Sequence, residues 1–319
     1  MTKDLLSFEG LSAEELRGIF RMAAEMKMKP QDTAGAMRGK TAALIFEKQS
    51  LRTHVSFQVG IAQMGGESVY LSQQHIGLST RESVRDVAEV LSCYNDLIVA
   101  RTMSHDTAEQ LGRYANVPVI NALTDMLHPC QILADAFTLI ERGTFSEATK
   151  IAFIGDGNNI VNSWLELAEK LPFHFVLACP EGYEPDHAIL DRASAAGVSR
   201  IDVCHDPFEA AEGAHVLYTD VWVSMGQEGE TEARQKSFRG FQINEALLRK
   251  ADPSCVVMHC LPAHRGEEIT ADALEGTRSV VLHQAENRLH VQKAIMALLM
   301  RNSISSALRR DHMLQELTV

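Results

Sequence analysis

Two patterns of hydrophobic positions alternate along the chain. Short runs of apolar, often β-branched residues predict buried strands, and between them apolar residues recur every three or four positions, as on one face of a helix. The segment 80–94 is an expected helix, because Ser79 and Glu82 form a capping-box pattern ahead of its apolar face. The expected strands are 41–47, 96–101, 117–120, 150–155, 174–179, 215–220, 255–260 and 279–283. This alternation predicts an α/β fold of parallel sheets flanked by helices.

The length and the order of these elements predict two domains. A chain of 319 residues corresponds to about two domains. The segment 128–142 is a long helical pattern between two strand–helix series, and we expect the chain to pass there from the first domain to the second. The last helical segment, at 285–310, is expected to return to the first domain. The expected domains are therefore 1–142 together with 290–319, and 143–289.

Composition narrows the classes of partner. With 42 acidic and 30 basic residues the formal net charge is −12, which argues against nucleic acid and against an anionic membrane surface. No apolar run approaches the ~18 residues of a membrane span, and the first residues lack the apolar core of a signal peptide. The six cysteines show no framework spacing and are expected to be reduced. We therefore expect a cytoplasmic protein in which any anion site is a local cluster of basic groups.

The most informative strand end is the turn Ser50-Leu51-Arg52-Thr53, which follows the strand 41–47 and opens a helical pattern. In open α/β sheets, ligands bind beyond the carboxyl ends of the strands. A helix start offers backbone N–H groups and the positive end of its dipole, and Arg52 adds a guanidinium suited to phosphate oxygens. Ser50 and Thr53 add hydroxyls. The turn predicts an anion site, although taken alone it is equally compatible with a capped helix beside an exposed arginine.

Further polar groups stand at strand and helix ends elsewhere. Arg101 ends one strand, and His128 opens the crossing helix with Gln131 on about the same face. A histidine at a helix start either donates to a carbonyl or phosphate oxygen or is a structural residue at a proline-initiated helix. Arg288, ahead of the last helix, either completes the anion site or is a surface charge.

The segment 155–159, GDGNN, is similar to the start of a dinucleotide-binding fingerprint. Ile160 occupies the position of the third glycine, which that fold needs for close packing of helix on strand. We therefore favour a tight turn that presents the amide of Asn158 or Asn159 to a small polar ligand over a nicotinamide site.

Two strand ends of the second domain carry a carboxylate and a thiol. Asp220, with the loop Ser224-Met225-Gly226, suggests a site for the ammonium of an amino-acid-like ligand, with an ordinary solvated loop as the alternative. Cys260 is a candidate for a substrate contact or a proton-transfer role, with a buried core cysteine as the alternative. The spacing of the histidines in HCLPAHR matches no common metal motif, so no metal is expected there.

The motifs above belong to six longer stretches that span the chain. They are FEKQSLRTHVSF (46–57), HPCQILAD (128–135), IGDGNN (154–159), DVWVSMGQE (220–228), MHCLPAHRG (258–266) and AENR (285–288). In sequence and in order they resemble the aspartate/ornithine transcarbamylase family. The stretches DVWVSMGQE and HCLP look like the ornithine branch of that family in particular.

The resemblance implies that the δ-amine of L-ornithine attacks carbamoyl phosphate to give L-citrulline and phosphate, with no metal or organic cofactor. It implies that the first domain binds carbamoyl phosphate and the second binds ornithine. The implied carbamoyl phosphate ligands are Ser50, Leu51, Arg52, Thr53, Arg101, His128, Gln131, Cys260, Leu261 and Arg288. The implied ornithine ligands are Asn159, Asp220, Ser224 and Met225. The implied catalytic groups are Arg101, His128, Cys260 and Asp220.

Two positions depart from the family's pattern. The phosphate turn usually reads Ser-Thr-Arg-Thr-Arg, so Leu51 stands in place of a threonine and is expected to contribute its backbone N–H. A loop around 72–80 usually reaches into a neighbouring subunit's site. Gly77 aligns with its reaching side chain, and Gln74 or His75 are candidates to replace it. The resemblance also implies a homotrimer or a multiple of trimers.

Other functions stay open at this point. One alternative is a carbamoyltransferase that acts on putrescine or N-acylornithine, and a second is a nicotinamide-dependent oxidoreductase. A third alternative is a non-catalytic binding protein. The incomplete glycine fingerprint and the separate anion turn weigh against an oxidoreductase. The presence of Arg101, His128, Asp220 and Cys260 together weighs against a loss of catalysis.

Overall fold

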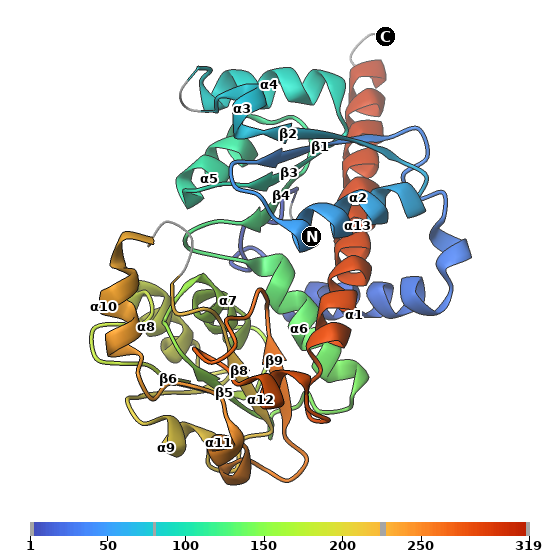
Figure 1. The fold of residues 1–319 in the computed structure, drawn as a ribbon. Helices are drawn as coiled ribbons and strands as arrows, with labels where there is room; N and C mark the ends of the chain where they lie inside the picture. Colours follow the sequence, from blue (N-terminus) through green and yellow to red (C-terminus); the bar gives the residue numbers. More distant parts are fainter. Residues whose placement is uncertain (1–2, 79–80, 224–227, 317–319) are drawn as a thin grey trace. The chain divides into compact units, whose positions relative to one another are not determined.

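The structure, a computed structural model, describes residues 3–78, 81–223 and 228–316, with side chains except at 75, 228 and 302–316. The chain forms two compact units. Unit 1 comprises Met1–Thr124 and Arg288–Val319, and unit 2 comprises Asp125–Asn287. Each unit is built on its own parallel sheet flanked by helices (Figure 1).

Unit 1 contains a four-stranded sheet in the order β2-β1-β3-β4. Its strands are β1 (Thr41–Phe46), β2 (Glu67–Ser72), β3 (Leu97–Arg101) and β4 (Val119–Leu123), all parallel. Its helices are α1 (Ala13–Met28), the 3₁₀ turn η1 (Pro30–Thr33), α2 (Leu51–Gln63), α3 (Gln73–Ile76), α4 (Val84–Tyr94) and α5 (His105–Tyr114). The inner strand β1 is buried over five of its six residues, as expected for a strand covered on both faces.

Unit 2 contains a five-stranded parallel sheet in the order β7-β6-β5-β8-β9. Its strands are β5 (Lys150–Ile154), β6 (His174–Ala178), β7 (Arg200–Cys204), β8 (Val216–Thr219) and β9 (Val256–His259). Its helical elements are α6 (Pro129–Glu141), α7 (Asn159–Ala168), α8 (His187–Ala196), α9 (Pro207–Ala211), η2 (Glu228–Glu230), α10 (Thr231–Ser237), α11 (Glu245–Lys250) and α12 (Ala271–Glu275).

The last helix, α13 (Val281–Glu316), begins in unit 2 and continues into unit 1 from Arg288 onward. In unit 1 it packs against α2, where Gly60 makes the close approach possible. A Cβ atom at Gly60 would lie only 3.1 Å from Cγ of Lys293. Farther along α2, Lys293 donates a hydrogen bond to Gln63 at 3.1 Å. The expected return of the C-terminal helix to the first domain is confirmed.

The predicted α/β fold with parallel sheets is confirmed, and three details of the strand prediction are wrong. The strands β2 and β7 were not predicted, because both are edge strands whose half-exposed residues form no continuous apolar run. The segment 279–283 is not a strand. Ser279 makes an isolated bridge with Val257, and α13 begins at Val281. A short apolar run does not distinguish a strand from the start of a buried helix.

The helices expected at 128–142 and at 80–94 are both present. The helix expected at 128–142 is α6, and the helix expected at 80–94 is α4. Ser83 caps α4 by accepting a hydrogen bond from the backbone N–H of Asp86. The Ser79 of the predicted capping box lies outside the described residues. Within the described part of the chain, no helix has the length and apolarity to span a membrane.

Candidate active site

The turn between β1 and α2 in unit 1 has the geometry of a helix start that faces an anion. Ser50 is the N-cap of α2, with extended backbone, and its hydroxyl accepts from the backbone N–H of Thr53 at 3.3 Å. The side chain of Leu51 is 75% exposed, so this residue offers its backbone at the first turn of the helix. Thr53 is almost fully buried. The helix start therefore combines a fixed cap with the positive end of a helix dipole.

Arginines from two other elements of unit 1 stand beside this turn. Arg288 of α13 is 3% exposed, and its guanidinium donates to the hydroxyl of Thr53 at 3.0 Å. Arg101 ends β3 and pairs in register with Phe46, the last residue of β1. The backbone N–H of Glu47 then donates to the carbonyl of Arg101. With Arg52 in the turn itself, three arginines from separate elements belong to this end of the sheet, and guanidinium groups are suited to phosphate oxygens.

In unit 2, the carboxylate of Asp220 lies at the centre of a cluster at the strand ends. Asp220 follows β8 and is 9% exposed. One carboxylate oxygen accepts from the thiol of Cys260 at 2.8 Å and from the backbone N–H of Val221 at 2.8 Å. The other accepts from the amide of Asn158 at 3.0 Å. The structure therefore unites Asp220 and Cys260, as the sequence predicts, and adds Asn158 to them.

The segment after Cys260 is held in an unusual conformation by a buried pair. Leu261 has φ 58°, which is a left-handed backbone conformation. This conformation is unfavourable for a residue that has a Cβ atom and is typical of strained functional sites. Its backbone N–H donates to Nδ1 of His259 at 2.8 Å. The opposite ring nitrogen of His259 donates to the Glu268 carboxylate at 3.0 Å, and both side chains are fully buried. The peptide bond between Leu261 and Pro262 is cis.

The pairing of His259 with Glu268 supports this segment, and the sequence did not indicate it. Glu268 also accepts from the backbone N–H of His264 at 2.6 Å, and the backbone N–H of His259 donates to Gln284. These contacts fix the segment that carries Cys260 and Leu261. The sequence signal for this pair was the position of His259 at a strand end, directly before Cys260. Such a position is compatible with many roles.

The start of α6 places His128 and Gln131 in a buried polar network of unit 2. His128 is the N-cap residue, and its backbone N–H donates to the hydroxyl of Ser163 at 2.7 Å. Gln131 donates to Asp135 at 2.8 Å. The Asp135 carboxylate also accepts from the Tyr218 hydroxyl at 2.7 Å and from the Gln284 amide at 2.8 Å. Gln131 is thus oriented by a carboxylate that three elements of the unit share.

The turn at 155–159 does not form a nucleotide site. In a dinucleotide fold, the second glycine lets the backbone approach a pyrophosphate. Here a Cβ atom at Gly157 would lie 2.4 Å from the backbone of Glu184 and Pro185, so protein occupies that space. Asn158 caps α7 by accepting from the N–H groups of Ile160 and Val161. The amide nitrogen of Asn158 contacts Asp220, and Asn159 is the first residue of the helix. The presentation of either amide to a ligand stays a prediction.

A buried ion pair connects this turn to α10. The guanidinium of Arg234 lies 2.8 Å from the carboxylate of Asp156, and the two side chains are 7% and 8% exposed. Arg234 also donates to the carbonyl of Trp222 at 3.0 Å and lies over the ring of Tyr183. Burial raises the pKa of Asp156 to about 6, although the Arg234 charge opposes this shift. Ser224 and Met225, which the sequence predicts as ligands, lie outside the described residues.

These two groups of residues, an arginine-rich anion turn and a carboxylate–thiol cluster on separate parallel sheets, define an α/β transferase. The chain belongs to the aspartate/ornithine carbamoyltransferase family. Residues 3–141 match the sequence model of the family's carbamoyl-P binding domain, and residues 147–299 match that of its Asp/Orn binding domain.

Individual relatives cover nearly the whole chain. The ornithine carbamoyltransferase of Chlorobaculum tepidum is 50% identical over 317 residues, which are 98% of this chain and 94% of that protein. The crystal structure of the anabolic ornithine carbamoyltransferase from Campylobacter jejuni matches with a TM-score of 0.90 at 37% identity, over 94% of this chain and all of that one. The ornithine carbamoyltransferase from Pyrococcus furiosus matches with a TM-score of 0.88 at 46% identity, over 93% and 96%.

The raised pKa of Asp156 predicts a pH-dependent stability. Because the folded protein binds this proton more tightly than the unfolded chain, the carboxyl contributes stability at low pH that is lost as the pH rises through about 6. Between pH 4 and pH 7 the loss is about 2 kcal/mol. We expect Asp156→Asn to abolish this component, so that the wild type loses more free energy of unfolding than the variant over this range in urea titrations.

Asp252→Asn is the matched control. Asp252 is a partly exposed carboxylate whose pKa is lowered by hydrogen bonds from Ser254, so its removal should leave the fall that comes from Asp156 in place. Parallel pH profiles for wild type and Asp156→Asn would contradict the assignment of a raised pKa to Asp156.

Proposed function

We propose that this protein transfers the carbamoyl group of carbamoyl phosphate to the δ-amine of L-ornithine, giving L-citrulline and phosphate. The observation that carries the proposal is the Asp220 carboxylate, which stands at a strand end with the Cys260 thiol and the Asn158 amide as its partners. A carboxylate in this position suits the ammonium of an amino acid. Membership of the carbamoyltransferase family and relatives named ornithine carbamoyltransferase support the reaction.

Unit 1 would bind the phosphate of carbamoyl phosphate. We infer that Ser50, Arg52, Thr53 and the backbone N–H of Leu51 hold the phosphate. The capped helix start and the contact of Arg288 with Thr53 support this inference, because both orient donors at the same turn. We assign carbamoyl phosphate to the domain formed by the N-terminal part of the chain and the C-terminal helix. We assign ornithine to the domain formed by the residues between these two segments.

A second set of groups would act on the carbamoyl moiety. Thr53, Arg101 and His128 are assigned to polarise its carbonyl oxygen and to stabilise the oxyanion that develops there. Gln131, the carbonyl of Leu261 and Arg288 are assigned to orient it. The strained backbone at Leu261 supports its role, since a left-handed residue turns its carbonyl away from the direction of an extended strand.

Ornithine would be bound by Asn159, Asp220, Ser224 and Met225, with Cys260 at the amine that reacts. The amine must be neutral to attack the carbonyl carbon. As its nitrogen forms the new C–N bond, the C–O bond to phosphate breaks, the phosphate leaves with that electron pair, and the nitrogen gives up one proton. Binding both substrates in line contributes much of the rate by proximity.

Amine selectivity tests the proposed function. We expect citrulline to form from carbamoyl phosphate and L-ornithine with a kcat/KM at least about a hundredfold above that for putrescine or N-acetylornithine, since N-acetylornithine lacks the α-ammonium that Asp220 would bind and putrescine lacks the α-carboxylate of the amino acid. Colorimetric detection of the ureido product in parallel reactions measures all three. A preference for putrescine or N-acetylornithine would reassign the acceptor, and carbamoylation of none of them would contradict the proposed reaction.

The phosphate turn is tested separately by binding of inorganic phosphate. We expect Arg52→Ala to weaken binding at least about tenfold, because a charge-assisted hydrogen bond contributes about 1.5–3 kcal/mol. Leu51→Thr restores the family's usual residue at an exposed position and should change the affinity by less than Arg52→Ala does. Isothermal titration calorimetry of each variant measures the dissociation constant.

Arg21→Ala is the control for Arg52→Ala. Arg21 belongs to the same unit and forms an exposed ion pair with Glu14, so its loss should leave phosphate binding unchanged. Equal affinities for Arg52→Ala and Arg21→Ala would rule out the phosphate role of Arg52.

We also propose that the chain assembles as a homotrimer or a multiple of trimers. One face of α2 exposes Leu51, Val55 and Val59 at helical spacing, and the neighbouring edge strand β2 exposes Val69 at 48%. An apolar face of this kind on a monomer is typical of a subunit interface. We infer a cytoplasmic location from the sequence.

Light scattering tests the assembly. We expect a molar mass of three chains or a multiple of three, and we expect Val55→Glu to reduce it because it places a charge on the apolar face of α2. Val90→Glu alters a comparably exposed valine on α4 and should leave the mass unchanged. A wild-type mass of one or two chains would contradict the proposed trimer.

A further inference from the structure

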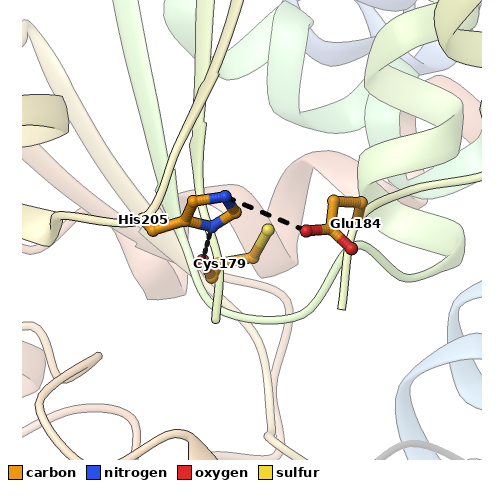
Figure 2. A group of neighbouring side chains, drawn as sticks. All are labelled: Cys179, Glu184 and His205. Carbon is orange, nitrogen blue, oxygen red and sulfur yellow. Dashed lines mark hydrogen bonds and ion pairs between the residues drawn. The ribbon is translucent and has the colours of Figure 1, made fainter. Parts of the chain in front are cut away.

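A cluster of three side chains with metal-binding donors lies at the carboxyl edge of the unit 2 sheet, apart from the Asp220 group. Cys179 directly follows β6, and His205 directly follows the neighbouring strand β7. Glu184 lies in the connection from β6 to α8. Figure 2 shows the imidazole, the thiol and the carboxylate directed toward one another. Their donor atoms all lie within 4.8 Å of one another.

Hydrogen bonds orient two of the three donors. Nδ1 of His205 lies 2.8 Å from the carbonyl of Cys179, and because a carbonyl only accepts, this nitrogen carries the proton. The lone pair therefore resides on Nε2, which faces a carboxylate oxygen of Glu184 at 3.9 Å. A histidine fixed through its other nitrogen by a backbone carbonyl is the usual arrangement of a metal ligand.

Two other groups of histidine, cysteine and carboxylate side chains occur among the described residues, and members of both are already engaged in hydrogen bonds within the protein. In the group of Asp220, His259 and Cys260, both ring nitrogens of His259 are engaged, by Leu261 and by Glu268. In the group of His264, Glu267 and Glu268, one Glu268 oxygen already accepts two hydrogen bonds. In the Cys179 group, the hydrogen bond from Nδ1 of His205 to the carbonyl of Cys179 orients the ring and leaves Nε2 directed at Glu184.

The charge around Cys179 favours a cation. Burial, with smaller contributions from Glu184, Asp156 and Cys204, raises the pKa of the Cys179 thiol to about 12. The neighbours that act electrostatically on the thiol are thus all acidic groups. The side chains of His205 and Glu184 are 46% and 29% exposed, which gives an ion a path from solvent.

We propose that Cys179, Glu184 and His205 form a binding site for a borderline-soft divalent metal ion of the Zn²⁺ class. A thiolate, an imidazole and a carboxylate supply three ligands, and a water molecule supplies the fourth position of a tetrahedron. With metal–ligand bonds of about 2.0–2.3 Å, the donor atoms would lie roughly 3.3–3.8 Å apart, so no pair needs to close by more than about 1.5 Å. Coordination releases the thiol proton of Cys179 to solvent.

The site is built into the connection that supports the Asp220 group. The backbone N–H of Gly157 donates to the carbonyl of Tyr183, next to Glu184, at 2.9 Å. A bound ion would tie Glu184 to the ends of β6 and β7 and so stiffen the support of the turn that presents Asn158. The site is separate from the reacting groups, and carbamoyl transfer itself does not require it.

Cobalt(II) is the probe, because a cobalt–thiolate bond produces a charge-transfer band that reports a cysteine ligand directly. The full chain is stripped of metal with a chelator and titrated with Co²⁺ under reducing conditions. We expect one equivalent of Co²⁺ to bind with a thiolate-to-cobalt band and with the intense visible bands of tetrahedral cobalt. His205→Ala, an exposed position, should weaken this binding at least about tenfold, and Cys179→Ala should abolish the band.

Matched variants complete the test. His187→Ala removes another exposed histidine of unit 2, and Cys204→Ser removes the cysteine next to His205, and both should leave the titration unchanged. The proposal is overturned if the wild type gives no thiolate band, or if the band persists in Cys179→Ala. Loss of the band in Cys260→Ser with retention in Cys179→Ala would place the ion at the Asp220 group and would equally overturn the proposal.

Discussion

Parallel strands all end at the same edge of their sheet, and the clusters of polar residues at the strand ends of this protein depend on that constraint. In unit 1, the register of β1 and β3 brings Arg101 beside the residue that ends β1, four positions before Ser50. In unit 2, the neighbouring strands β8 and β9 bring Asp220 and Cys260 within 2.8 Å. The helices that follow the strands then direct their N-termini to the same edge. Residues distant in sequence are thus assembled without any local sequence signal.

Buried polar contacts fix these groups once the strands have placed them. Asp135 accepts hydrogen bonds from three side chains and thereby orients Gln131, and the pair of His259 and Glu268 holds the segment of Cys260 and Leu261. Burying a polar group costs several kcal/mol unless its hydrogen bonds are formed. Only the geometry in which all these hydrogen bonds are formed is therefore favourable, so the contacts select one geometry more than they add to the overall stability of the fold. A site that stabilises one transition state requires that kind of fixed geometry.

The sequence predicted what depends on local pattern. The parallel α/β fold, the inner strands and the crossing helix follow from apolar runs and helical periodicity, and the union of Asp220 with Cys260 follows from the rule of strand ends. The edge strands β2 and β7 could not be found this way, because half of their surface is exposed and their apolar runs are broken. The start of α13 was taken for a strand because three apolar residues fit either element.

The remaining misses are long-range contacts. Arg234 pairs with Asp156 across 78 positions, and no spacing rule links them. Asn158 contacts Asp220 across 62 positions, because the cap position of α7 places its amide beside the strand ends. Polar residues of this kind become interpretable only when the fold has placed their partners.

The central claim is that the carbamoyl carbon becomes bonded to the δ-nitrogen of ornithine. Carbamoyl phosphate labelled with ¹³C and ornithine labelled with ¹⁵N at the δ-nitrogen, followed together by NMR during turnover, test it most directly. The account predicts a product whose labelled carbon shows one-bond coupling to the δ-nitrogen, with release of phosphate at the same rate. Phosphate release without that coupling, or carbamoylation at the α-nitrogen, would contradict the account.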